Sequence, residues 1–337
     1  MAEVRVGIDA SPLVLTRAGT HRYVASLSKA LDETGEVELR PYSFGRSGRL
    51  SSLARDLVWY PLALPRRAAR DSVNVLHATT MRAPLHTDVP LVVTVHDLAV
   101  IRCPWAFNRW NAKYSRRTLP RIVAAAEKVI AVSEFTASEL TALLDVPSKK
   151  VAVVRHGVGD SFSTEGRAAE GDYVLCVSTL EPRKNLERLA EAFAGAKLPN
   201  TELRIAGESG WGAVRLRDGT CTTRQLGHVE DDELAALYRG ALCVAYVSLY
   251  EGFGLPVLEA LACGAPVVAA DIPALREVAG DAAVYVDPLD VASISAGLRE
   301  ALSRREQLSA AGPIRAAGFT WEQAARDTID VYRDAGA

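Results

Sequence analysis

Short strand-like runs, most of them apolar, recur along the whole chain and alternate with stretches of helical spacing. In the first half the runs are Val4–Asp9, Val37–Tyr42, Val73–His77, Leu91–Val95, Val129–Val132 and Val151–Val154. In the second half they are Tyr173–Val177, Leu203–Ala206, Arg224–Leu226, Leu242–Val247, Pro266–Ala269 and Ala283–Val286. Apolar strands separated by helices are typical of parallel sheets that are covered on both faces. The pattern therefore predicts an α/β fold of doubly wound sheets.

The chain length favours two such sheets. A single core rarely grows beyond about 250–300 residues, and this chain has 337. Residues 160–172 are polar and show no periodicity, which is typical of a connection between domains. We therefore expect a first Rossmann-like domain over 1–163 and a second over 164–318.

The N-terminal segment and the cysteines bear on the compartment. Residues 1–9 lack the basic and apolar regions of a signal peptide, and no uncharged apolar run is long enough to span a membrane. The five cysteines form no C-x-x-C pair. We expect a cytoplasmic protein with free thiols.

The net charge of −2 conceals an asymmetry. The stretch from Arg40 to Arg121 holds 14 basic residues and four acidic ones. Such asymmetry indicates contact with an anionic partner, although arginines on solvated helix faces would give the same count.

The most informative segment runs from Ser248 to Gly264 and follows a predicted strand. In it Gly252 and Gly254 allow close approach of a ligand to the backbone, and a helix start brings free N–H groups that suit an anion. Glu251 and Glu259 can accept hydrogen bonds from sugar hydroxyls; the alternative is a helix cap and a surface residue.

Two further segments follow predicted strands in the same way. Arg183 and Lys184 lie at the start of a helix, where adjacent cations suit a diphosphate. His96 follows the run Leu91–Val95 and could contact a sugar or the reacting centre. Solvated cations and a structural histidine are the alternatives.

Together these segments resemble the retaining nucleotide-sugar glycosyltransferases of the family 4 type, which have the GT-B fold of two Rossmann-like domains facing across a cleft. The most specific part is the Glu-x7-Glu motif from Glu251 to Glu259. Residues 181–186 and 227–229 and the Val-Ser-Glu-Phe-Thr run at 132–136 are also similar to the family pattern.

The resemblance implies roles for individual residues. Arg183 and Lys184 would hold the donor diphosphate, Glu251 the transferred sugar and His96 the region of its reacting carbon. The other residues implied at the donor are Gly19, Gly207, His228, Val229, Phe253, Gly254, Leu255 and Glu259. The helix within 319–337 would cross back onto the first domain. One departure is His21, which stands where relatives often have a second glycine.

The implied reaction moves a hexose, of mannose or glucose type, from a GDP- or UDP-linked donor with retention of configuration. The acceptor could be a glycan, a lipid-linked molecule or a small molecule. No Asp-x-Asp motif is present, so we expect cations of the chain to replace a metal, and no cofactor.

The partners implied are the donor and the acceptor, without nucleic acid. Aromatic and basic residues are mixed within 57–67 and 105–117. Such faces can lie peripherally on an anionic membrane or bind a lipid-phosphate acceptor; the alternative is a soluble acceptor. A nucleotide-sugar epimerase or hydrolase of the same fold, and a non-catalytic sugar- or nucleotide-binding protein, remain alternatives.

Overall fold

The chain forms two compact units. The computed structural model describes residues 4–17, 19–45, 48–107, 109–208, 210 and 223–336. The first unit comprises Met1–Leu98, Trp110–Gly157 and Thr320–Ala337, and the second comprises Ala99–Arg109 and Val158–Phe319. Each unit is built around one parallel sheet of six strands.

The sheet of the first unit has the order β2-β1-β3-β4-β5-β6. Its strands are β1 (Val4–Asp9), β2 (Val37–Tyr42), β3 (Val75–Ala78), β4 (Leu91–Val95), β5 (Lys128–Ala131) and β6 (Val151–Val153). Its helices are α1 (Pro12–Leu15), α2 (Gly19–Thr34), α3 (Arg49–Ala54), the π-helix η1 (Arg55–Ala63), α4 (Leu64–Arg70), α6 (Arg109–Ala125), α7 (Glu134–Leu144), the 3₁₀ helix η3 (Ser148–Lys150) and α14 (Trp321–Asp334). The strand order reverses between β1 and β3.

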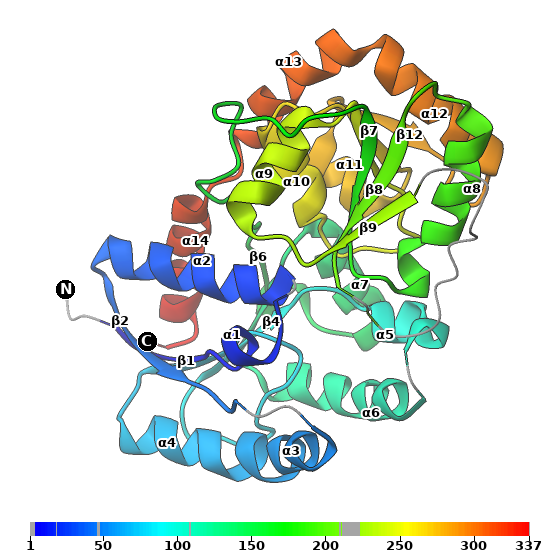
Figure 1. Cartoon of the computed structure of the whole chain (residues 1–337). Helices are drawn as coiled ribbons and strands as arrows, with labels where there is room; N and C mark the ends of the chain where they lie inside the picture. The colour runs from blue at the N-terminus through cyan, green and yellow to red at the C-terminus, as the bar shows by residue number, and fades with distance from the viewer. Residues whose placement is uncertain are drawn as a thin grey trace. The chain divides into compact units, whose positions relative to one another are not determined.

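Helices cover both faces of this sheet. Figure 1 shows α2 and α14 on one side of the strands and α4 and α6 on the other. One apolar core joins side chains of β1, α2 and the central strands to α14, including the buried residues Val6, Leu27, Val92 and Ile329. The C-terminal helix therefore belongs to the core of the first unit.

The sheet of the second unit has the order β12-β11-β10-β7-β8-β9. Its strands are β7 (Tyr173–Val177), β8 (Glu202–Ala206), β9 (Thr223–Gly227), β10 (Cys243–Tyr246), β11 (Val267–Ala270) and β12 (Ala283–Val286). Its helices include α5 (Ala99–Arg102), α8 (Leu186–Ala196), α9 (Asp231–Gly240), α10 (Leu255–Ala262), α11 (Pro273–Ala279), α12 (Val291–Ser303) and α13 (Arg305–Ala316). From the β9 edge this is the Rossmann order 3-2-1-4-5-6, and its switch point lies between β7 and β10.

The predicted strands are confirmed, with shifts of one or two residues at some ends. The sequence patterns do not predict every helix; α1, α5, α11, α13 and the helical segment over residues 49–70 were missed. Residues 305–316 contain the Gly-Pro pair at 312–313, which is typical of a turn, yet α13 continues through it. Residues 49–70 form a continuous helical segment whose middle turns are π-helical and contain Pro61, so its apolar residues do not follow the α-helical period.

Candidate active site

The predicted donor residues Arg183, Lys184 and Glu251 come together in the second unit. Arg183 and Lys184 lie on the single 3₁₀ turn Pro182–Lys184, which follows β7. Glu251 lies in the loop that follows β10, the neighbouring strand. Because both strands are parallel, their carboxyl ends meet at the switch point, where ligands bind in open α/β sheets.

Arg183 is the centre of the cluster. Its Nη1 donates to the backbone oxygen of Tyr250 at 2.7 Å and to Glu251 Oε2 at 3.1 Å. Its Nη2 donates to Glu181 Oε1 at 2.7 Å. The Arg183 side chain is only 10% exposed, so these charge-assisted bonds form in a largely dry environment.

Lys184 reaches the other oxygen of the same carboxylate. Its Nζ donates to Glu251 Oε1 at 2.6 Å and to the Tyr246 hydroxyl at 2.9 Å. The Tyr246 hydroxyl in turn donates to Glu251 Oε1 at 2.9 Å. The Glu251 carboxylate is therefore held on both oxygens by two cations and a phenol.

The electrostatics of the cluster keep Glu251 ionised. Burial alone would raise the pKa of Glu251, but the charges of Lys184 and Arg183 lower it to about 2. Burial, followed by the charge of Glu251, raises the pKa of Tyr246 well above its ordinary value. At neutral pH the site thus contains a carboxylate and a phenol that keeps its proton.

The hydrogen bonds that Arg183 and Lys184 donate at this site go to other groups of the protein. The four charged side chains, two cations and the carboxylates of Glu181 and Glu251, balance one another. To bind a diphosphate, Arg183 and Lys184 must therefore either contact it while they keep their bonds to the Glu251 carboxylate, or replace those bonds with bonds to the diphosphate. Their role at a diphosphate stays a prediction.

Sequence reasoning missed Tyr246 and Glu181. Tyr246 is the last residue of β10 and the one polar side chain of that strand, which is the signal that could have identified it. Glu181 is separated from the basic pair by Pro182 alone, and it is only 6% exposed. Both complete the hydrogen bonds of residues that were predicted.

The loop after Glu251 leads into α10 as expected. Gly254 has a φ of +123°, and a Cβ there would lie 2.6 Å from a side-chain carbon of Leu275, so this position requires glycine. Phe253 is buried, and Leu255 begins the helix. Glu259 is 2% exposed and accepts a hydrogen bond from the Tyr238 hydroxyl at 3.0 Å, so it is not a surface residue.

The remaining predicted donor residues of this unit lie at the ends of β8 and β9. Gly207 has a φ of +144°, and a Cβ there would lie 2.0 Å from the backbone oxygen of Ser178. Val229 is buried, whereas the His228 ring lies 3.1 Å from the exposed carboxylate of Glu230. These three residues lie on the same side of the sheet as the cluster, at strand carboxyl ends.

Gly19 and His96 belong to the first unit. Gly19 is the first residue of α2. His96 follows β4, and its Nε2 lies 3.0 Å from the backbone oxygen of Thr79, so Nε2 carries the proton in that bond. The ring packs edge-on against Tyr23, with 4.7 Å between ring centroids.

His96 is one of three histidines in this region. The ring centroids of His96 and His156 lie 5.6 Å apart. Both ring nitrogens of His77 form hydrogen bonds, Nδ1 with the Tyr332 hydroxyl and Nε2 with the Thr94 hydroxyl, each at 2.8 Å. Burial lowers the pKa of His96, lowers that of His77 to about 3 and lowers that of His156 well below its ordinary value. These histidines are therefore neutral at neutral pH.

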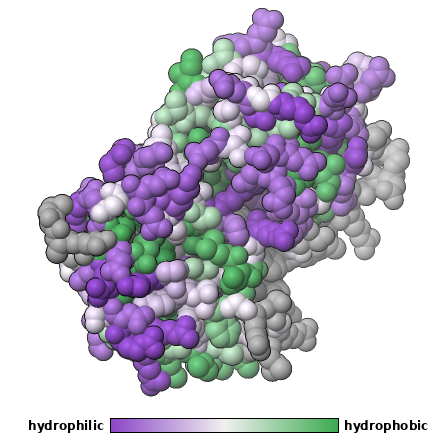
Figure 2. All heavy atoms as spheres, turned by 60° about the vertical axis from the view of Figure 1, so that its left-hand side comes forward, coloured by the Kyte–Doolittle hydropathy of each residue, from purple (hydrophilic) through white to green (hydrophobic). Residues whose placement is uncertain are grey.

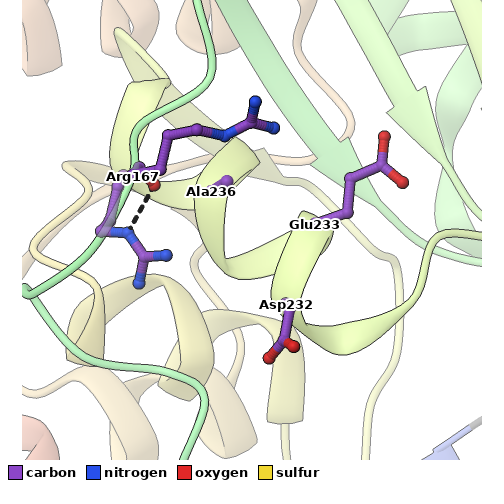
Figure 3. A pocket seen from close by; sticks show the side chains of 5 residues that line it. Arg167, Asp232, Glu233 and Ala236 are labelled. Atoms are coloured by element: carbon purple, nitrogen blue, oxygen red, sulfur yellow. Dashed lines mark hydrogen bonds between the residues drawn. The ribbon is translucent and has the colours of Figure 1, made fainter.

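A hollow of about 490 Å³ lies elsewhere on the second unit. It is lined by Arg167, Asp232, Glu233, Ala236 and Arg239, mostly from α9 (Figure 3). Arg239 crosses it to donate to the Arg167 backbone oxygen at 2.9 Å. None of the predicted site residues lines it.

Two kinds of feature are absent from the described residues. No group of three or more His, Cys, Asp or Glu side chains there is placed to hold a metal ion. None of the helices in that part of the chain is long and apolar enough to cross a bilayer.

Two family models match consecutive parts of the chain. The model described as Glycosyltransferase Family 4 matches residues 15–162, and the model of glycosyl transferases group 1 matches residues 160–314. The O-antigen chain mannosyltransferase B of Escherichia coli is 33% identical over 90% of this chain and 88% of its own length.

Solved structures share the fold. Sucrose-phosphate synthase from Thermosynechococcus elongatus superposes with a TM-score of 0.81 over 98% of both chains at 18% identity. Anabaena HepE in complex with UDP-glucose gives a TM-score of 0.72 over 97% of this chain and 99% of its own, at 17% identity. With the family models and the mannosyltransferase relative, these matches confirm the expected family and fold: the chain is a glycosyltransferase of the family 4 type with the GT-B fold.

Proposed function

We propose that this glycosyltransferase moves a hexose from a nucleoside-diphosphate sugar to a hydroxyl of its acceptor, with retention of the anomeric configuration. The observation that carries the proposal is the cluster of Arg183, Lys184 and Glu251 at the switch point of the second sheet. A buried pair of cations beside an ionised carboxylate suits a ligand with a diphosphate next to sugar hydroxyls.

Mannose is the favoured hexose, with glucose as the second choice. The Escherichia coli relative, 33% identical, is named a mannosyltransferase, whereas the HepE structure, similar in fold alone, holds UDP-glucose. The donor is accordingly a GDP- or UDP-linked sugar. The acceptor is a glycan, a lipid-linked molecule or a small molecule.

The cluster suggests how the chain lowers the barrier. As the bond between the sugar and the diphosphate breaks, negative charge develops on the departing phosphate, and Arg183 and Lys184 stabilise it without a metal ion. Glu251 holds both cations in place and accepts hydrogen bonds from the sugar. The acceptor hydroxyl attacks from the side on which the diphosphate leaves, and the diphosphate oxygen takes its proton, which preserves the anomeric configuration.

Thermal denaturation against GDP, UDP, ADP and TDP, with and without EDTA, tests the donor site. A ligand at 100 times its Kd adds about 2.7 kcal/mol to the free energy of unfolding. We expect one nucleotide to stabilise the protein, with EDTA having no effect and Lys184→Ala abolishing the shift. The anomer of the product, read by NMR, tests retention.

Other outcomes would point to other activities. Release of free sugar or of an epimerised donor without an acceptor would indicate a hydrolase or an epimerase. Stabilisation by no nucleotide would refute the donor site and favour a sugar-binding protein. Loss of activity on chelation would refute catalysis without a metal.

We further propose that the first unit contacts an anionic membrane through the helical segment 49–70. Leu53, Leu57, Val58 and Leu62 are 50%, 60%, 53% and 45% exposed. The lower end of the molecule, where Figure 1 shows α3 and α4, presents hydrophobic atoms beside hydrophilic ones (Figure 2). Exposed arginines follow at positions 66, 67 and 70. Apolar side chains flanked by cations suit an anionic interface.

The aromatic residues of this segment do not take part, contrary to the expectation from sequence. Trp59 and Tyr60 are 3% and 5% exposed and face the core. The apolar contact would instead be made by aliphatic side chains. Arg67 lies over the Trp59 ring at 5.0 Å, which orders the cation beside the apolar face.

Co-sedimentation with vesicles tests this surface. We expect the protein to bind vesicles containing phosphatidylglycerol, to bind neutral phosphatidylcholine vesicles less, and to be released by salt. The double change Leu57→Ser and Leu62→Ser should abolish binding. Leu289→Ser, at a leucine of the second unit that is 66% exposed, is the matched control. Binding retained in the double variant would refute the surface.

A further inference from the structure

Arg55 is a mostly buried cation whose charge is incompletely matched. Its side chain is 13% exposed, and its Nε is buried with no hydrogen-bond partner within the described residues. Its ion-pair partner is Asp56, whose Oδ1 lies 3.9 Å from Nε, beyond hydrogen-bond distance. Buried charges in proteins are normally paired and hydrogen-bonded, so the site is suited to an additional anion.

Asp56 is engaged by a second guanidinium. Arg82 donates through Nη1 to Asp56 Oδ1, the same oxygen that faces Arg55. The Asp56 side chain is 14% exposed and that of Arg82 is 29% exposed. Two guanidinium groups therefore face one oxygen of the same carboxylate, and Arg82 keeps part of its surface open to a ligand.

The pair lies at the ligand-binding edge of the first sheet. Arg82 follows β3 closely, and Asp9 ends β1, so both flank the point where the strand order reverses. Tyr60, from the same π-helix as Arg55, donates its hydroxyl to Asp9 Oδ2 at 3.0 Å. The Thr79 hydroxyl donates to the Asp9 backbone oxygen at 2.6 Å, which ties the two strand ends together.

Asp9 lies within reach of the charge of Arg55, but its carboxylate oxygens accept hydrogen bonds from other groups. The carboxylate of Asp9 is fully buried, and its Oδ1 accepts from the Ser11 backbone N–H at 3.0 Å and the Ser11 hydroxyl at 2.6 Å. With Tyr60 on Oδ2, both of its oxygens are occupied by neutral donors. Burial raises the pKa of Asp9, an effect that its hydrogen bonds and the charge of Arg55 only partly offset.

We propose that Arg55 and Arg82 bind a phosphate group of the acceptor. This inference rests on the proposed function; it places the acceptor on the first unit and names the acceptor class as a phosphorylated molecule. Guanidinium groups bind phosphate through paired N–H donors, so the two side chains fit its oxygens better than they fit a neutral hydroxyl. The Tyr114 ring, 5.9 Å from the Arg82 guanidinium, flanks the site.

The test measures phosphate binding in a Lys184→Ala background, which removes a cation of the proposed donor site. Isothermal titration calorimetry with glycerol 3-phosphate, with glycerol as the uncharged probe, should show binding of the phosphate ester alone. Arg55→Gln and Arg82→Gln should each raise its Kd at least tenfold. Arg116→Gln, an exposed arginine on the helix that carries Tyr114, is the matched control and should bind as the background does.

A second probe separates a soluble phosphate from a lipid headgroup. If the acceptor is lipid-linked, dihexanoyl phosphatidic acid below its micelle concentration should bind more tightly than glycerol 3-phosphate. If the acceptor is soluble, the two ligands should bind equally. In both cases Arg55→Gln should weaken the binding of dihexanoyl phosphatidic acid. Arg55→Lys, which keeps the charge but loses the fork of donors, should bind with intermediate affinity and guards against misfolding of the glutamine variant.

Two results would overturn the proposal. One is a Kd for glycerol 3-phosphate that is unchanged in both Arg55→Gln and Arg82→Gln. The other is no binding of glycerol 3-phosphate or phosphatidic acid in the Lys184→Ala background. Nucleotide stabilisation of the protein with Lys184 intact is measured separately, so failure of the donor site and failure of this phosphate site give different results.

Discussion

Replacing Glu251 by glutamine tests the electrostatics of the donor cluster. The change keeps the shape of the side chain but removes the negative charge that holds Arg183 and Lys184. Both cations are only 10% exposed, so they would remain buried without that partner. We therefore expect Glu251→Gln to destabilise the second unit.

The magnitude follows from the pKa of Glu251. Its fall from the ordinary value of 4.5 to about 2 corresponds to about 3 kcal/mol of interaction with the ionised form. Removal of one partner of a buried ion pair typically costs about 3–5 kcal/mol, which agrees in size. Because the pKa is lowered on folding, this stability is present above about pH 4.5 and is lost as the pH falls towards about 2.

Urea denaturation followed by circular dichroism measures the effect. The difference in free energy of unfolding between Glu251→Gln and the unchanged protein should be about 3 kcal/mol at pH 7. This difference should shrink as the pH falls from 4.5 to 3, because the unchanged protein then loses the stability that it gains from the ionised Glu251 carboxylate. Because Glu251→Gln and the unchanged protein are compared at the same pH, the effect of all other titrating groups on the free energy of unfolding cancels.

A second readout connects the cluster to function. Without the carboxylate, Arg183 and Lys184 should bind pyrophosphate more tightly, whereas sugar transfer should fall. Glu306→Gln, at an exposed glutamate of α13, is the control and should change neither property. A loss below about 1 kcal/mol at pH 7, or a loss that does not depend on pH, would refute the reasoning.

Two further predictions concern the histidines and a glycine. Burial keeps His77, His96 and His156 neutral, so the unfolded chain binds more protons below its histidine pKa of about 6.5. The first unit should therefore lose stability as the pH falls below about 6.5. His77, whose pKa is lowered to about 3, should contribute about 1.4 kcal/mol per pH unit over that range. Equal urea midpoints at pH 7 and pH 5 would contradict this. Gly207→Ala should lower the free energy of unfolding by at least about 1–3 kcal/mol, because a φ of +144° is strained for alanine and the Ser178 backbone oxygen leaves no room for a Cβ. An unchanged melting temperature would contradict this and show that the loop relaxes.

The strands and their order along the chain could be predicted because the signals are local. Runs such as Leu91–Val95 and Tyr173–Val177 are apolar over their whole length and end at polar residues. In a parallel sheet those polar residues lie at the ligand edge, which is why Arg183, Lys184 and Glu251 could be selected without coordinates. Their functional roles remain predictions.

The segment 49–70 could not be predicted in the same way. A π-helix has more residues per turn than an α-helix, so apolar residues such as Leu57 and Leu62 fall five positions apart rather than three or four. Sequence reasoning treated Trp59 and Tyr60 as surface aromatics because the same stretch contains Arg66 and Arg67. The structure buries both and exposes their aliphatic neighbours.

The class of fold, the family and the loops that carry the chemistry can be read from the amino-acid sequence, since hydrophobic periodicity and short motifs are properties of consecutive residues. Which distant side chains meet depends on the folded structure. Tyr246 and Glu251 join Lys184 across more than 60 positions of the chain, and Arg82 reaches Asp56 across 26. Such contacts depend on which strands become neighbours and which helix face is buried, and the free energy of packing the whole core sets both.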